Sequence, residues 1–194
     1  MDVMLLSYDA LESLVDSDLN TAKFRLAGWR RDRRFHVQML PTREIIKWHL
    51  MRARLRAAVL CPDFLSRGAA AGAILRLENA QHAAVWMWWE HDFVERRLIV
   101  FPVSSERPPD HSREMQNLLA AAVREAAAAR LPEIVVWEPP ADMWDAAISM
   151  ADDEKFGWSI AVHKEEANLK AHMRWQFGLD QDVVWHDRQY YCAC

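Results

Sequence analysis

Three strand-like runs follow one another with only short connections, and this spacing limits the possible folds more than any other feature of the chain. The runs are AILRLE, AAVWMWWEHDF and RRLIVFPVSS. Their connections, at 79–82 and 94–95, are short enough for hairpins, so the spacing predicts an antiparallel meander. A helical pattern and another apolar run, EIVVWE, come next, and a strand–helix–strand unit needs a right-handed crossover. The order predicts an α/β fold with a mixed, mostly antiparallel sheet and flanking helices.

Helices and a further strand are expected before this meander. Ser7 can cap a first helix, and a second is expected within 16–28. The alternating run RFHVQML (34–40) predicts a strand, and Thr42 can cap a helix over 43–60. We expect the inner side of that helix to consist of Ile45, Ile46, His49, Leu50, Ala53 and Val59.

The second half of the chain continues the same alternation of elements. The range 61–72 contains proline and glycine and predicts a loop. A helix is expected over 141–150, and strands over 157–165 and 182–192. We therefore expect one domain over 1–194, with a helical extension at 1–33 and a core at 34–194.

Composition excludes several classes of protein. Apolar residues make up 52% of the 194 residues, enough for a folded domain with a substantial core. The net charge of −4 does not suit a nucleic-acid binder. No apolar run approaches the roughly 20 residues that a membrane-spanning helix needs, and the N-terminus lacks a secretory pattern. Three cysteines form no disulfide framework, so we expect a cytoplasmic protein.

The order of elements from Arg34 onward resembles the GNAT acyltransferase fold. Several local patterns resemble, more narrowly, the C-terminal domain of the fungal lysine N-acetyltransferase family. They are LPTREIIKWHLMRAR, RGAAAGA, VWMWWEHDFVERRLIV, GWSIAVHKEEA and MRWQFGLDQDVVWHDRQYYCAC. The family also has an N-terminal acetyltransferase domain, and the resemblance implies that this chain is the second half standing alone.

The loop SSERPPDHSREM (104–115) departs from the pattern of GNAT enzymes. In those enzymes spaced glycines after the fourth strand let backbone amides bind the pyrophosphate of coenzyme A. Here no glycine lies between residues 73 and 156, and Pro108 and Pro109 each remove a donor. The acetyl-CoA site is therefore expected to be degenerate. We expect no bound cofactor, and if acyl-CoA binds at all, the side chains of Arg107 and Arg113 must hold it.

Two further departures support this expectation. GNAT enzymes often use a tyrosine as general acid towards the departing thiolate, and this chain has no tyrosine between Tyr8 and Tyr190. Pro102 lies in the strand that would pair with the pantetheine arm, and it has no N–H to offer. Acetyl-CoA-dependent transfer of the usual kind is therefore not favoured.

The strand AAVWMWWEHDF carries the first group of residues that could do other chemistry. Alternation places Trp86, Trp88, Glu90 and Asp92 on one face. Two aromatic rings beside two carboxylates are a plausible binding site for a cationic amine, with Glu90 as general base. The alternative is an ordinary charged strand end that faces solvent.

A second group lies on the helix at 43–60 and near the C-terminus. His49 and Arg52 are three residues apart and share a helix face. His49 could transfer a proton and Arg52 could bind a carboxylate; the alternative, which is the more usual one, is a buried histidine satisfied by a neighbour, with a surface arginine. The resemblance to GNAT folds implies that Tyr190 borders the acceptor cleft. The CAC ending lacks the second ligand pair of a structural zinc site, so no metal is predicted.

Three functions remain open from the sequence. The first is a GNAT-fold enzyme acting on a small amine or an amino-acid-derived metabolite, with a degenerate acetyl-CoA site. The second is a non-catalytic module that binds such a ligand or docks on a partner chain, with a homodimer also possible. The third is a catalyst of another cytosolic reaction in the old acceptor cleft. An enzyme should lose turnover on Glu90→Gln or His49→Ala, whereas a docking module should show an exposed apolar patch.

Overall fold

The computed structural model describes most of the expected core. The described residues are 2–11, 14–15, 19–20, 23, 27, 35–38, 42–66, 68–76, 84–102, 112–136, 139–153, 159–161 and 183–186. The strands are β1 (Val3–Leu6), β2 (Phe35–Gln38), β3 (Gly72–Arg76), β4 (Ala84–Asp92), β5 (Arg97–Pro102), β6 (Glu133–Val136) and β7 (Val183–His186). The helices are α2 (Arg43–Leu60), α3 (Pro62–Ser66), α4 (Ser112–Ala128) and α5 (Ala141–Ala151).

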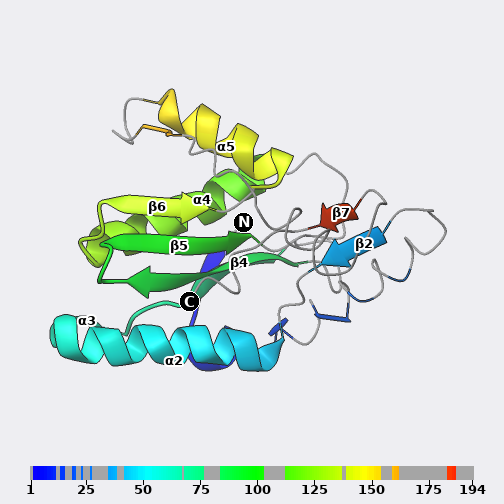
Figure 1. Ribbon diagram of the computed structural model, residues 1–194. Helices are drawn as coiled ribbons and strands as arrows, with labels where there is room; N and C mark the ends of the chain where they lie inside the picture. Colours follow the sequence, from blue (N-terminus) through cyan, green and yellow to red (C-terminus); the bar gives the residue numbers. More distant parts are fainter. Residues whose placement is uncertain are drawn as a thin grey trace.

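The main sheet has five strands in the order β1-β3-β4-β5-β6 (Figure 1). Strands β3, β4 and β5 form the predicted antiparallel meander. Strand β6 then pairs with β5 in parallel, from Arg97↔Glu133 to Val100↔Val136, and α4 is the connection. The sheet is thus mixed and mostly antiparallel, with flanking helices, which confirms the predicted α/β fold class.

Strand β1 was not predicted. Its four residues, Val3–Leu6, pair antiparallel with β3, and Leu6 lies opposite Gly72. They fall within the range 1–33, for which only helices were expected, and their pairing makes them part of the main sheet. Four residues are too few to show a strand period, and the partner strand is far away in the sequence. Helix begins after them, where Ala10 N–H donates to Ser7 Oγ at 3.2 Å, as the predicted cap requires.

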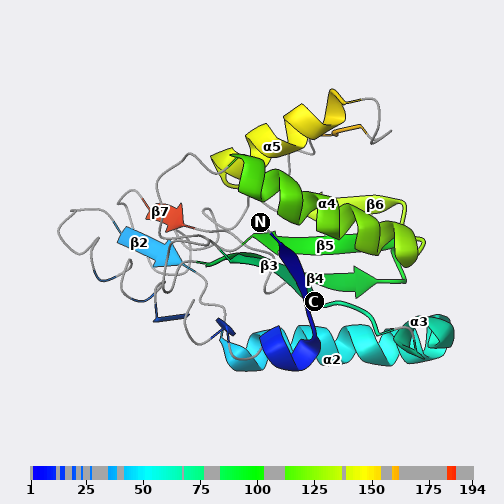
Figure 2. The ribbon, with the colours of Figure 1, turned by 180° about the vertical axis from the view of Figure 1, so that it is seen from behind.

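The sheet lies between two layers of helices. Helix α2 covers one face, and α4 covers the other with α5 above it, as Figure 2 shows from behind. The alternation in β4 serves both layers, because Val85, Met87 and Trp89 belong to the core beneath α4 and α5. Trp86 and Trp88 belong to the core beneath α2. This division is the one that the period of two predicted.

Helix α2 begins and ends where the sequence predicted. Thr42 Oγ1 accepts a hydrogen bond from Ile45 N–H at 3.4 Å and caps its first turn. The buried residues of the helix are Ile46, His49, Leu50, Ala53 and Ala57. Val59 was predicted on the inner side but is 75% exposed. Two residues beyond Ala57, the helix has turned by about 200°, which points Val59 away from the sheet.

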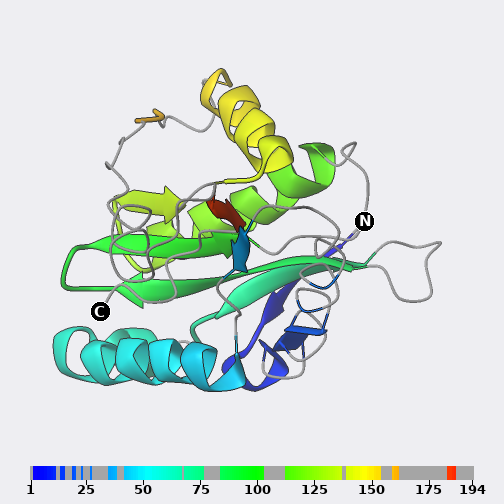
Figure 3. The same ribbon diagram turned by 45° about the vertical axis from the view of Figure 1, so that its right-hand side comes forward.

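Strands β2 and β7 form a separate parallel pair, in register from Phe35↔Val183 to Gln38↔His186. The pair lies beyond the end of β5, and Figure 3 brings it forward. The loop expected over 61–72 contains the short helix α3. Within the predicted strand at 157–165, the described residues 159–161 are not in a strand. No helix in the described ranges has both the length and the hydropathy to cross a bilayer.

Candidate functional site

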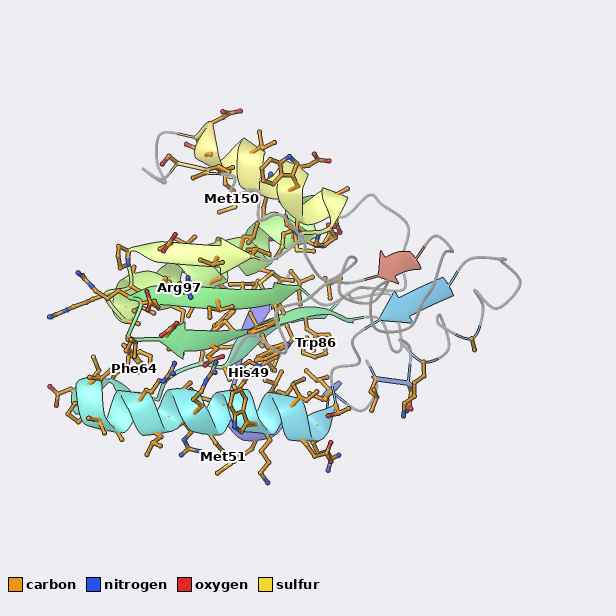
Figure 4. All side chains as sticks on the ribbon, viewed as in Figure 1. His49, Met51, Phe64, Trp86, Arg97 and Met150 are labelled. Atoms are coloured by element: carbon orange, nitrogen blue, oxygen red, sulfur yellow. The ribbon has the colours of Figure 1, made fainter. Side chains whose placement is uncertain are left out.

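Three of the predicted site residues meet between α2 and β4. His49 Nδ1 lies 2.6 Å from Glu90 Oε2. Arg52 donates from Nε and Nη2 to Glu90 Oε1, at 3.1 and 2.9 Å, and from Nη2 to Oε2 at 3.1 Å. Figure 4 shows His49 pointing from α2 towards the sheet. An ionised carboxylate only accepts, so the Nδ1 proton of His49 points at Glu90.

This cluster is closed to solvent except at one point. The side chains of Glu90 and His49 are 0% exposed, and that of Arg52 is 18% exposed. Its guanidinium group carbon lies 4.4 Å from the centre of the Trp48 ring, which is itself partly exposed. A buried charge is costly unless it is paired and hydrogen-bonded. Both oxygens of Glu90 are engaged, and the cluster therefore fastens α2 to β4.

The two predicted substrate-binding tryptophans lie in the interior. Trp88 is 1% exposed, and its ring stacks on Phe101 with centroids 3.8 Å apart and planes 6° apart. The His49 ring meets Trp88 and Phe101 edge-on, at 6.1 and 5.6 Å. Trp86 is also buried. Phe101 occupies one face of the Trp88 ring. The role of the two tryptophans in binding a cationic amine stays a prediction.

Asp92 organises the turn between β4 and β5. Its Oδ1 accepts from Glu95 N–H at 3.3 Å and lies 3.6 Å from Arg56 Nη1. Its Oδ2 lies 3.5 Å from Nε of Arg97, which is an ion-pair distance rather than a good hydrogen bond. Asp92 is buried beside these cations. It thus forms a second charged contact between β4 and α2, two residues along the strand from Glu90.

Three predicted site residues remain, namely Arg113, Arg107 and Tyr190. Arg113 is exposed in the first turn of α4. Arg107 lies outside the described residues with the rest of the loop at 103–111, and so does Tyr190. Within the described ranges, no group of three or more His, Cys, Asp or Glu side chains is placed to hold a metal ion.

Sequence reasoning missed a second polar network, on the opposite face of β4. His91 Nε2 lies 3.0 Å from Glu125 Oε1 of α4, and Ala70 N–H donates to the same oxygen at 3.2 Å. Trp89 Nε1–H donates to the carbonyl of Ala70 at 2.8 Å. The rings of Phe64 and Phe93 both contact the ring of His91. The available signal was a histidine on the apolar face of a strand, because a buried imidazole needs a polar partner.

Tyr8 is the described residue whose pKa departs clearly from its ordinary value. Burial raises the pKa of Tyr8 to about 12, and the nearby Arg54 partly opposes this rise. The Arg54 guanidinium group lies 5.3 Å from the centre of the Tyr8 ring. The phenol is therefore neutral over the whole physiological range, and it packs against the core beneath α2.

Comparison with known proteins identifies the family. No curated protein matches the chain at a significant level. One solved structure, described as "Crystal structure of a probable acetyltransferase", covers 85% of this chain and 100% of its own at 11% identity. Its TM-score is 0.44. The family model of the LYC1 GNAT-like C-terminal domain matches residues 1–194. The chain therefore belongs to the LYC1 GNAT-like C-terminal domain family.

Proposed function

We propose that this GNAT-like chain is a binding module that docks on a partner protein domain and does not use Glu90 and His49 for acyl transfer. One observation carries the proposal. The side chains best suited to chemistry, Glu90 and His49, are buried under α2. The outer face of the same helix exposes large apolar side chains, including Met51 and Leu55. Contiguous exposed apolar surface of this kind marks an interaction site.

The geometry of Glu90 supports a structural role. A general base must come within hydrogen-bond reach of the proton that it removes. Both oxygens of Glu90 already accept from His49 and Arg52, and its side chain has no exposed area. Removing either partner would leave the carboxylate buried and underpaired, so the three side chains depend on one another for folding.

A degenerate acetyl-CoA site is part of the proposal. The stretch 104–115 has no glycine and contains Pro108 and Pro109. A backbone nest for pyrophosphate needs consecutive free N–H groups, which two adjacent prolines cannot supply. The exposed side chain of Arg113 is a poor substitute, because a lone surface cation binds phosphate weakly.

A second candidate is an enzyme that acts on a small amine or an amino-acid-derived metabolite. The observation in its favour is Arg52, whose guanidinium group extends from Glu90 to the surface beside Trp48. A substrate carboxylate could bind this arginine, and an ammonium group could stack on the exposed indole. In that case Glu90 and His49 would act only after Arg52 had moved away.

Calorimetric titration with acetyl-CoA and coenzyme A, followed by an amine-acetylation assay, tests whether the chain uses acyl-CoA. The binding module should give no saturable heat in the micromolar range, and the tryptophan fluorescence should not change. Saturable acetyl-CoA binding that coenzyme A competes away would refute the proposed function. Release of free thiol with lysine or another amine, lost in Glu90→Gln at unchanged thermal stability, would establish the enzyme instead.

A further inference from the structure

The outer face of α2 carries a continuous apolar row. Trp48, Met51, Leu55 and Val59 are 44%, 61%, 70% and 75% exposed. Their spacings of three, four and four residues place them on one side of the helix. Figure 4 shows Met51 pointing away from the sheet, opposite to His49. We name these four side chains the α2 row.

The fold does not need the α2 row. The inner face of α2 already buries its own set of residues against the sheet, and the row lies on the other side. A spacing of three and four residues is the pattern with which one helix packs along another. From Trp48 to Val59 the row is about 17 Å long at 1.5 Å per residue. A contact of this length suits a short helix.

The charges beside the α2 row are unequal on its two sides. On one side, Arg52 and Arg56 are paired with Glu90 and Asp92 of β4. On the other side lie Lys47 and Arg54, both exposed and seven residues apart. In the part of the chain that the structure describes, no carboxylate pairs with either of them. This side of the row therefore carries two positive charges, with Arg54 also 5.3 Å from the centre of the Tyr8 ring and Glu44 one turn before Lys47.

We propose that the α2 row binds an acidic amphipathic helix of a partner domain, an inference that rests on the proposed function. Glutamate or aspartate beside the partner's apolar seam would face Lys47 and Arg54, two helical turns apart. A second copy of α2 would instead bring positive charge to positive charge. A membrane surface fits less well, because interfacial helices insert a broad apolar face and the α2 row is narrow.

Fluorescence anisotropy with two labelled peptides tests this surface on the full chain. Both peptides have about three heptads with the same leucine and isoleucine seam; one has glutamates beside the seam and the other has lysines. The glutamate peptide should bind saturably, and the lysine peptide about tenfold more weakly at low salt. Leu55→Lys should weaken binding of the glutamate peptide at least about tenfold, because it places a charge in the apolar contact.

Ile148→Lys is the matched control, because Ile148 is an exposed apolar residue on α5, across the sheet from α2. It should leave binding unchanged, and both variants should keep the thermal midpoint of the wild type. Equal affinity for the two peptides, no saturable binding of either, or an unaffected Leu55→Lys would each overturn the inference. So would binding to vesicles of phosphatidylserine and phosphatidylcholine, or self-association in sedimentation, if Leu55→Lys abolished it.

The two proposals fail in different ways. Acetyl-CoA binding or amine acetylation refutes the module itself, whatever the peptides do. If neither occurs and Leu55→Lys binds the peptides as the wild type does, the proposed function stands and only the assignment of the binding surface is wrong.

Discussion

Replacing Glu90 by glutamine tests whether the cluster under α2 is structural. The substitution keeps the size of the side chain and one acceptor oxygen, but it removes the charge that His49 and Arg52 share. Glutamine can still accept from Arg52 through its amide oxygen, whereas its amide nitrogen can no longer accept from a second donor. We therefore expect Glu90→Gln to fold and to be markedly less stable than the wild type.

The magnitude follows from burial. Removing one partner of a buried ion pair costs about 3–5 kcal/mol. Arg52 is 18% exposed and can regain some hydration, whereas His49 is 0% exposed and cannot. These facts place Glu90→Gln near the lower end, at about 3 kcal/mol. For a chain of this size, 1 kcal/mol shifts the thermal midpoint by about 2–4 °C, so the midpoint should fall by roughly 6–12 °C.

Urea and thermal denaturation, followed by tryptophan fluorescence, measure this change. Glu95→Gln in the exposed turn after β4 is the control, and it should alter the free energy of unfolding by less than about 0.5 kcal/mol. A double-mutant cycle with Arg52→Gln should give a coupling of about 1–3 kcal/mol. The structural interpretation of the cluster is refuted if Glu90→Gln is as stable as the wild type.

Three further predictions concern other parts of the fold. Gly72→Ala should destabilise the protein by several kcal/mol in urea denaturation, because its Cβ would meet the backbone oxygen of Met87; wild-type stability would contradict the β3–β4 register. The pKa of Tyr8 is raised to about 12, so an unfolded tyrosine ionises first and the free energy of unfolding should fall between about pH 10 and 12. Tyr8→Phe should lessen that fall, and the same pH profile in this variant would contradict the role of Tyr8. Glu125→Gln weakens the charge-assisted bond to His91 and should lower the thermal midpoint by about 2–8 °C in calorimetry; no shift would contradict the network.

Local patterns were enough to predict most of the fold. The meander, the cap at Thr42 and the extent of α2 depend on residues close together in the sequence, and the structure confirms them. Strand β1 depends instead on a partner about 70 residues away, and the run VMLL has no period of its own. The error at Val59 has a simpler cause, since an apolar residue in the last turn of a helix does not have to face the core.

The candidate site was predicted only in part. Alternation and helical spacing placed Glu90 on one strand face, and His49 and Arg52 on one helix face. Neither pattern says which helix face packs on which strand face, so the contact among the three residues is tertiary information. His49 is buried and contacts Glu90, and Arg52, which the alternative interpretation took for a surface arginine, is bound to the same carboxylate. Trp88 stacks on Phe101 in the core, a contact that alternation within one strand does not predict.

The two charged contacts between α2 and β4 also set the register of the helix on the strand. Four residues of helix advance about 6 Å and two residues of strand about 6.7 Å, so Arg52 and Arg56 repeat at nearly the same interval as Glu90 and Asp92. Sliding α2 by one helical turn would leave a charge unmatched at one end. A single residue inserted between the arginines would turn the rest of the helix by about 100°. The number of residues between the two arginines thus determines both the charged contacts of α2 with the sheet and the direction in which the α2 row points.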